Sequence, residues 1–242
     1  MKNVFLVSDL GAVEKINGVR FSKELDNKNK LIDNLKNSLK KQNKILFFAS
    51  DPDGYEKTDT YSKLIFESLN KSGFTFKEYK VVDHRYSDIL EEDIKTADLV
   101  FLSGGYTPLE MVYYEEIKLR DLLKNYEGVI VGQSAGAINL ASTVVYTLEY
   151  EEELSKFNMT YKGLDKTNIN IEPHFTLEPK DTKIREMLLD ITEKYPLYAL
   201  CDGSYIHIID NKNTLYGEAY YIDKKDIKKI CSDKESIEVK EE

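Results

Sequence analysis

The most specific chemical signal in the sequence is the run Gly132-Gln133-Ser134-Ala135-Gly136. It stands between an apolar segment, GVIV, typical of a buried strand, and a small-residue segment, AGAINLA, typical of a helix start. In that context a G-x-S-x-G sequence predicts a nucleophile elbow, a strained turn that holds a serine hydroxyl out at the carboxyl edge of a sheet. A plain turn between strand and helix would also need small residues, so the motif alone leaves both interpretations open.

A serine hydroxyl is a weak nucleophile that needs a base within hydrogen-bond reach, and histidine titrates in the useful range. The sequence contains 3 histidines. We expect His84, in a polar turn, to be solvated, and His207, in the apolar run YIHII, to be structural. His174, in the segment NIEPHF beyond the serine, is therefore the predicted base.

The acid that would orient the imidazole is less sharply defined. Glu149, which lies between Ser134 and His174, is the first choice. However, an acidic run is usually a solvated loop, and the Asp-Gly pair at 202–203 is also typical of a plain hairpin turn. The alternatives that stay open are Glu151, Glu152, Glu153 and Asp202.

A second motif, GGYTPLE, follows another core strand. Thr107 and Glu110 occupy the N-cap and capping-box positions of the helix that should begin there. Capping does not explain the two preceding glycines, Gly104 and Gly105, whose backbone could approach a ligand closely. We predict that these glycines and the N–H of Ala135 form an oxyanion hole, although turn geometry alone is an alternative.

The elements that must position these motifs alternate along the chain. Short β-branched and aromatic runs are followed by longer segments of helical period, which predicts βαβα order and a mainly parallel central sheet with helices on both faces. Runs such as ILFFA and LVFL are apolar without alternation, as strands buried on both faces must be. The expected strands are NVFLV, KILFFAS, KEYKVV, DLVFLSGG and GVIVGQ, and the expected helices span 25–41, 60–71, 89–95 and 107–124.

The pattern changes after about residue 143. An acidic stretch, one helix near 180–194 and the runs YIHII and TLYGEAYYI predict hairpins added to the sheet. We expect a single domain over residues 1–231, followed by a charged, frayed C-terminal tail at 232–242.

Composition excludes several classes of function. The formal net charge of -9 argues against a nucleic-acid partner, which requires a basic surface. No apolar run is long enough to span a membrane and the N-terminus does not resemble a signal peptide, so we expect a cytoplasmic protein. Two cysteines without CxxC spacing and scattered histidines predict no disulfide, no metal and no cofactor.

The interval between Ser134 and His174 is too short for the further βα units that an α/β-hydrolase places between its nucleophile and histidine. A flavodoxin-like or glutamine-amidotransferase-like layered sheet fits better. With ILFFAS, LSGGYTPLEM, GVIVGQSAGAINLAS, NIEPHFTL and ALCDGSYIHI assembled, the chain resembles the serine peptidase family that contains dipeptidase E (aspartyl dipeptidase) and, more distantly, cyanophycinase.

The resemblance implies a class I glutamine-amidotransferase-like fold with Ser134 as nucleophile, His174 as base and an acid matching Glu149. It also implies an oxyanion hole from the backbone of Gly105 and Ala135. The chain departs from the family in two places: its usual Gly-Gly-Asn-Thr is Gly-Gly-Tyr-Thr here, and its substrate-binding arginine has no clean counterpart, the nearest cations being Lys180 and Lys183. The predicted substrate-binding residues are Tyr106, Gln133 and Lys180.

These residues predict a serine peptidase that acts on dipeptides or short peptides through an acyl-enzyme, with an N-terminal aspartate as one candidate preference. The predicted partner is a small peptide, and a homodimer is left open. Two alternatives also stay open: an esterase or amidase acting on a non-peptide acyl substrate, and a catalytically inactive ligand-binding homologue.

Overall fold

In the computed structural model, which describes residues 2–86, 90–147, 159–179 and 181–241, the largest sheet is a central one of 8 strands. Within the described residues its strand order is β16-β13-β12-β1-β7-β6-β4-β5. Five neighbouring strands in this order, β1, β7, β6, β4 and β5, are parallel to one another. The three-layer α/β/α prediction is confirmed. The parallel strands are β1 (Asn3–Val7), β4 (Lys44–Phe48), β5 (Glu78–Val82), β6 (Leu99–Leu102) and β7 (Val129–Gln133), and the antiparallel ones are β12 (Tyr205–Ile209), β13 (Lys212–Tyr216) and β16 (Ser236–Val239).

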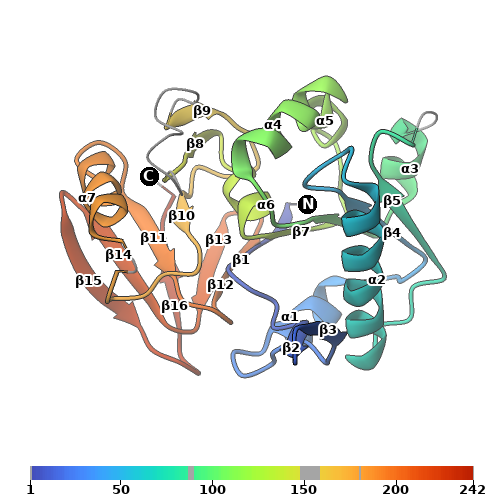
Figure 1. Cartoon of the computed structure of the whole chain (residues 1–242), viewed down its shortest axis with the longest axis horizontal. Coiled ribbons are helices and arrows are strands. Elements are labelled where there is room, and N and C mark those ends of the chain that lie inside the picture. Colours follow the sequence, from blue (N-terminus) through green and yellow to red (C-terminus); the bar gives the residue numbers. More distant parts are fainter. Residues whose placement is uncertain (1, 87–89, 148–158, 180, 242) are drawn as a thin grey trace.

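Two separate hydrophobic cores cover the two faces of this sheet, because successive side chains of a strand point to opposite faces. In β1, Phe5 and Val7 belong to the core formed with α1 and α2, whereas Val4 and Leu6 belong to the core formed with α3 to α6. Figure 1 shows α1 and α2 separated by the sheet from α4, α5 and α6. The helices are α1 (Leu31–Ser38), α2 (Tyr55–Lys71), α3 (Leu90–Thr96), α4 (Thr107–Glu116), α5 (Leu119–Leu122) and α6 (Ala135–Ile138).

Four strands from the last third of the chain form a second sheet, ordered β10-β11-β14-β15, which Figure 1 shows beside α7. This sheet has its own hydrophobic core with α7. The prediction of hairpins added to the central sheet is right for β12 and β13. It is wrong for β14, which leaves the central sheet and pairs with β11 and with β15, a strand that was not predicted. These elements are β10 (Ile171–Glu172), β11 (Leu197–Leu200), β14 (Ala219–Asp223), β15 (Asp226–Cys231) and α7 (Thr182–Ile191); β8 (Thr143–Val145) and β9 (Thr160–Lys162) form a separate hairpin.

A hairpin that the sequence analysis did not predict, β2 (Val13–Ile16) and β3 (Val19–Ser22), precedes α1. Asn17 and Gly18 form its turn with φ of 49° and 84°, the conformation that an Asn-Gly pair favours between two strands. The hairpin is fastened to α2, since Ser68 Oγ donates to Ala12 O at 2.6 Å and Lys71 Nζ donates to Ser22 Oγ at 2.9 Å. Among the described residues, no helix has the length and apolar character needed to cross a membrane.

The prediction that residues 232–242 form a frayed tail is wrong. Residues 236–239 form β16, an edge strand that pairs antiparallel with β13. Val239 is 7% exposed and packs in the same core as Val4 and Leu215, and Lys2 Nζ lies 2.8 Å from Glu241 Oε1. The charged residues of this segment obscured a two-residue period that places only one side of the strand in the core.

Val239→Ala should lower the free energy of unfolding by about 1–2 kcal/mol, because it removes buried methyl groups from this core. The exposed neighbouring change Glu238→Ala is the matched control and should stay within about 0.5 kcal/mol of wild type. Urea unfolding monitored by circular dichroism measures both. Equal stability of the two variants would show that the C-terminal strand does not contribute to the fold.

Candidate active site

Ser134 lies at a strained turn between β7 and α6. Its backbone has φ of 51° and ψ of -116°, a combination that non-glycine residues rarely adopt, and its N–H donates to Val7 O at 2.9 Å. A Cβ at Gly132 would lie 2.7 Å from the backbone of Ala137, and one at Gly136 would lie 2.7 Å from Ser103 O. The glycines are therefore required by close approaches of α6 to β7 and β6, and the turn has the geometry of a nucleophile elbow.

His174 reaches Ser134 from the second sheet. It follows β10, where it adopts φ of 56°, and its Nε2 lies 3.0 Å from Ser134 Oγ. That distance is within hydrogen-bond reach, so the imidazole can accept the hydroxyl proton. The structure thus brings together the serine and histidine that the sequence analysis selected.

Asp202 is the acid that contacts the histidine, with Oδ1 2.6 Å from His174 Nδ1. β10 and β11 are parallel neighbours, and Phe175 N donates to Leu200 O at 3.0 Å, so the residues that follow the two strands lie side by side. Asp202 was one of the alternatives left open by the sequence. The first choice, Glu149, and the alternatives Glu151, Glu152 and Glu153 lie outside the described residues.

The carboxylate of Asp202 sets the protonation of His174. Their hydrogen bond raises the pKa of the imidazole above its ordinary value, against the opposing effect of burial, and the charges of Asp202, Asp9 and Glu172 act in the same direction as the hydrogen bond. Because Nδ1 faces a carboxylate, the neutral ring carries its proton on Nδ1 and leaves the Nε2 lone pair for Ser134.

Ser8, directly after β1, fastens the histidine and the aspartate to the central sheet. Its side chain is fully buried, and its Oγ accepts the backbone N–H of His174 at 2.8 Å. The same Oγ lies 3.2 Å from Asp202 Oδ1 and 3.2 Å from Leu200 O, either of which can take its single proton. Ser8 is not among the residues predicted from the sequence, although its position at the carboxyl end of a buried strand was the available signal.

Gly104 and Gly105 lie beside Ser134 without positive φ, so close approach and not backbone conformation requires them. A Cβ at Gly104 would lie 3.1 Å from Ser134 Cβ, and one at Gly105 would clash with the side chain of Ser50. The capping interpretation of the following helix is wrong in detail. Tyr106, not Thr107, is the N-cap residue, and the carboxyl group of Glu110 is buried.

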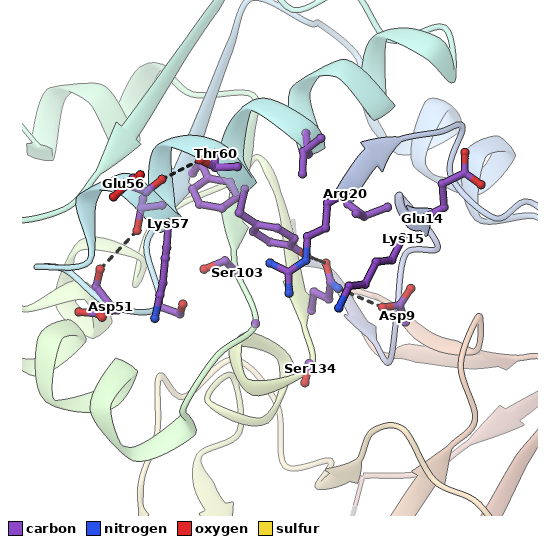
Figure 2. A pocket seen from close by; sticks show the side chains of 18 of the residues that line it. Asp9, Glu14, Lys15, Arg20, Asp51, Glu56, Lys57, Thr60, Ser103 and Ser134 are labelled. Carbon is purple, nitrogen blue, oxygen red and sulfur yellow. Dashed lines mark hydrogen bonds between the residues drawn. The ribbon is translucent and has the colours of Figure 1, made fainter. Parts of the chain in front are cut away.

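A pocket of about 780 Å³ opens in front of Ser134 at the carboxyl ends of β1, β4, β6 and β7. Figure 2 shows Lys15 and Arg20 reaching from the hairpin to the side that holds Asp9, with Lys57 on the opposite side and Ser134 below them. The pocket lies where the strand order reverses between β4 and β6, the usual place for a ligand in an open α/β sheet. Its remaining charged lining residues are Glu14, Asp51, Glu56 and His174.

The predicted substrate-binding residues have different outcomes. Gln133 lines the pocket, but its amide is already engaged: Tyr61 Oη donates to its Oε1 at 3.2 Å and its Nε2 donates to Asp9 Oδ2 at 3.4 Å. Tyr106 is half-buried, with its ring edge-on to Tyr146, and is not among the pocket-lining residues. Lys180 lies outside the described residues, and Lys183, in the first turn of α7, does not line the pocket.

The sequence analysis also missed Asp9, Lys15 and Arg20 as pocket residues. Asp9 comes two residues after the end of β1, much as Ser134 comes directly after β7, so the same strand-end argument applied to it. The Asn-Gly pair at 17–18 was the signal for the hairpin that carries Lys15 and Arg20.

The other two histidines lie where they were expected: His207 is buried and His84 is at the surface. His207 is 6% exposed, stacks on Phe5 with ring centroids 3.9 Å apart, and burial lowers its pKa to about 4. His84 is exposed, with Nδ1 2.7 Å from Asp53 Oδ1. In the part of the chain that the structure describes, no group of three or more His, Cys, Asp or Glu side chains is arranged to hold a metal ion.

Known proteins resemble this chain both in sequence and in structure. The sequence model of peptidase family S51 matches residues 18–216. A candidate peptidase E protein from Listeria monocytogenes EGD-e has a similar structure, with a TM-score of 0.62, 16% identity and coverage of 88% of this chain and 96% of that one. A peptidase from an acI-B1 Actinobacterium has a TM-score of 0.62 and 16% identity, covering 99% and 97%. Curated protein sequences yield no significant match. At this identity the two structures support the predicted fold class.

Asp202→Asn should lower the pKa of His174, because the variant removes the negative charge that stabilises the imidazolium form. Titration of the histidine ring signals by NMR measures this pKa, and loss of one signal in His174→Gln assigns it. His207 provides an internal control whose pKa should stay near about 4 in both proteins. An unchanged His174 titration in Asp202→Asn would show that Asp202 does not control the base.

Proposed function

Because the chain belongs to peptidase family S51 and is a serine-type peptidase, we propose that it hydrolyses dipeptides or short peptides through an acyl-enzyme formed on Ser134. The observation that carries the proposal is the chain of contacts from Ser134 Oγ to His174 Nε2 at 3.0 Å and from His174 Nδ1 to Asp202 Oδ1 at 2.6 Å. A cytoplasmic location belongs to the same proposal as an expectation from the sequence.

In the acylation step, Ser134 Oγ attacks the peptide carbonyl carbon while its proton passes to His174 Nε2. The carbonyl electron pair moves to oxygen, and the backbone N–H groups of Gly105 and Ala135 are the proposed donors to that oxyanion. The tetrahedral intermediate collapses, the C–N bond breaks, and the imidazolium gives its proton to the leaving amine. Asp202 holds the ring in position and stabilises its charged form throughout.

In the deacylation step a water molecule replaces the amine. His174 takes a proton from this water as it attacks the ester carbonyl, and returns the proton to Ser134 Oγ when the C–O bond breaks. Both half-reactions begin with a neutral imidazole, so the reaction slows as the pH falls through the raised pKa of His174.

The charges of the pocket support a short substrate with an acidic N-terminal residue. A dipeptide has a free, positively charged ammonium group beside its scissile bond, and the negatively charged side chain of Asp9 in the pocket could bind that group. Arg20 and Lys15 form no ion pair with any residue in the described ranges, and they lie on the same side of the pocket (Figure 2). The Tyr61 hydroxyl experiences both charges: burial chiefly raises its pKa to about 12, Asp9 adds to that effect and Arg20 opposes it.

Purified wild-type protein should hydrolyse members of a dipeptide panel in which the first residue is acidic, neutral or basic, and Ser134→Ala should lose at least about 10³-fold in kcat. Amine release measures turnover, and trapping of the acyl-enzyme by acid quench and mass spectrometry locates the acyl group. Equal rates for the two proteins would refute the proposed nucleophile. Turnover of esters without turnover of dipeptides would favour the esterase or amidase alternative, and ligand-induced thermal stabilisation without any turnover would favour a binding homologue.

Arg20→Gln should lower kcat/KM for Asp-X dipeptides by about 10- to 100-fold while changing that for Ala-X dipeptides by less than about threefold, because a charge-assisted hydrogen bond contributes about 1.5–3 kcal/mol. Lys23→Gln is the matched control: it removes one positive charge beside the hairpin, at an exposed position outside the pocket. An equal loss on both substrates, or an equal effect of Lys23→Gln, would exclude side-chain recognition by Arg20.

A further inference from the structure

A buried polar cluster that the proposed peptidase mechanism does not use lies next to the two segments that carry the proposed oxyanion donors, Gly105 and Ala135. Asn139, at the C-terminal end of α6, and Glu110, in the first turns of α4, are both 0% exposed. Asn139 follows Ser134 in the chain, and Glu110 follows the glycine pair 104–105. Burying an amide and a carboxyl group is unfavourable unless they form hydrogen bonds, so their partners indicate what they do.

Both polar atoms of the Asn139 side chain form hydrogen bonds, and Nδ2 reaches the segment that follows the glycine pair. Nδ2 donates to Thr107 O at 3.0 Å and lies 3.2 Å from Glu110 Oε2, and Oδ1 accepts from Tyr161 Oη at 3.1 Å. Its backbone N–H donates to Ala135 O at 3.0 Å. Asn139 is therefore bonded to Ala135, a proposed oxyanion donor, and to Thr107, the first residue of the helix that follows Gly104 and Gly105.

Glu110 completes this link from the side of α4. Its Oε2 accepts from Asn139, and its Oε1 faces Gly105, since a Cβ at Gly105 would lie 3.1 Å from that oxygen. Oε1 has no hydrogen-bond partner among the described residues. The carboxyl group of Glu110 therefore lies next to Gly105, on the side that the Ser50 side chain also fills.

We propose that Asn139 and Glu110 form a brace that fixes the distance between the backbone N–H groups of Gly105 and Ala135, and that both are positioning residues for the oxyanion hole. This inference rests on the proposed function, because it takes those N–H groups as the oxyanion donors. The path is short: Thr107 is two residues from Gly105, and Asn139 is bonded directly to Ala135. A donor that shifts by about 1 Å can lower the rate about 10²-fold, so such a link would act on the transition state.

Burial favours the neutral form of Glu110. Burial raises the pKa of this carboxyl group well above its ordinary value, and no cation contacts it among the described residues. A neutral acid can be replaced by an amide of nearly the same shape, whereas an apolar side chain of similar volume would keep the packing and remove the hydrogen bond to Asn139. Glutamine and leucine at this position therefore separate the bond from the filling of space.

The test compares Glu110→Leu, Glu110→Gln and Asn139→Ala with wild type. Two readouts are used: kcat and KM on the best dipeptide, and the rate at which a fluorophosphonate labels Ser134. In the labelling reaction Ser134 Oγ bonds to phosphorus, fluoride leaves and His174 takes the proton, so this readout does not depend on peptide turnover. The phosphoryl oxygen occupies the same donors as the oxyanion.

Glu110→Leu and Asn139→Ala should lower kcat and the labelling rate by about 10- to 100-fold with KM within about threefold, and Glu110→Gln should return both to within about threefold of wild type. Tyr114→Phe is the matched control. Like Glu110 Oε1, the Tyr114 hydroxyl is buried near this cluster and has no hydrogen-bond partner among the described residues. It should leave both rates unchanged.

Wild-type rates in folded Glu110→Leu would overturn the brace, and so would a Glu110→Gln variant as slow as Glu110→Leu. Folding is verified by thermal unfolding, and if Glu110→Leu does not fold, the rates of Asn139→Ala and Glu110→Gln distinguish the same two outcomes. Failure of the proposed function has a different signature, namely fluorophosphonate labelling of Ser134 and brace effects on labelling without dipeptide hydrolysis. Absence of labelling in wild type would overturn both.

Discussion

The hydrogen bond between His174 Nδ1 and Asp202 Oδ1, 2.6 Å long, is the interaction on which the arrangement of this site depends. His174 follows β10 of the second sheet, and Asp202 lies where the chain passes from β11 of that sheet to β12 of the central one. The bond fixes the imidazole tautomer and leaves Nε2 facing Ser134 Oγ, 3.0 Å away. Ser8 supports it from the central sheet by bonding the backbone of His174 and approaching the carboxylate of Asp202.

The site stores conformational strain, and packed elements around it maintain that strain. Ser134 and His174 both have positive φ, 51° and 56°, and such conformations typically cost about 1–3 kcal/mol each in non-glycine residues. Ser134 is held by its bond to β1, and His174 by Ser8 and by the pairing of β10 with β11. Glu110, fully buried next to Gly105, is a further unfavourable local feature that the surrounding packing maintains.

The pocket obtains its charges from elements outside the parallel core. The β2–β3 hairpin contributes Lys15 and Arg20, the first turn of α2 contributes Lys57, and Asp9 follows β1 (Figure 2). A loop or hairpin can change without disturbing the central sheet, so the charges of the pocket can vary independently of the turn that carries Ser134.

The sequence by itself determined the parallel core and singled out Ser134 and His174, because these depend on local patterns: buried apolar runs, a G-x-S-x-G turn and a histidine in the segment NIEPHF beyond the serine. It did not determine which acid meets His174, because that depends on the register between β10 and β11, which are far apart in the chain. Nor did it reveal that residues 236–239 complete the sheet, or that Arg20 reaches the pocket from the hairpin. Only the tertiary structure decides such contacts, since pairing and packing between distant segments leave little trace in the local order of residues.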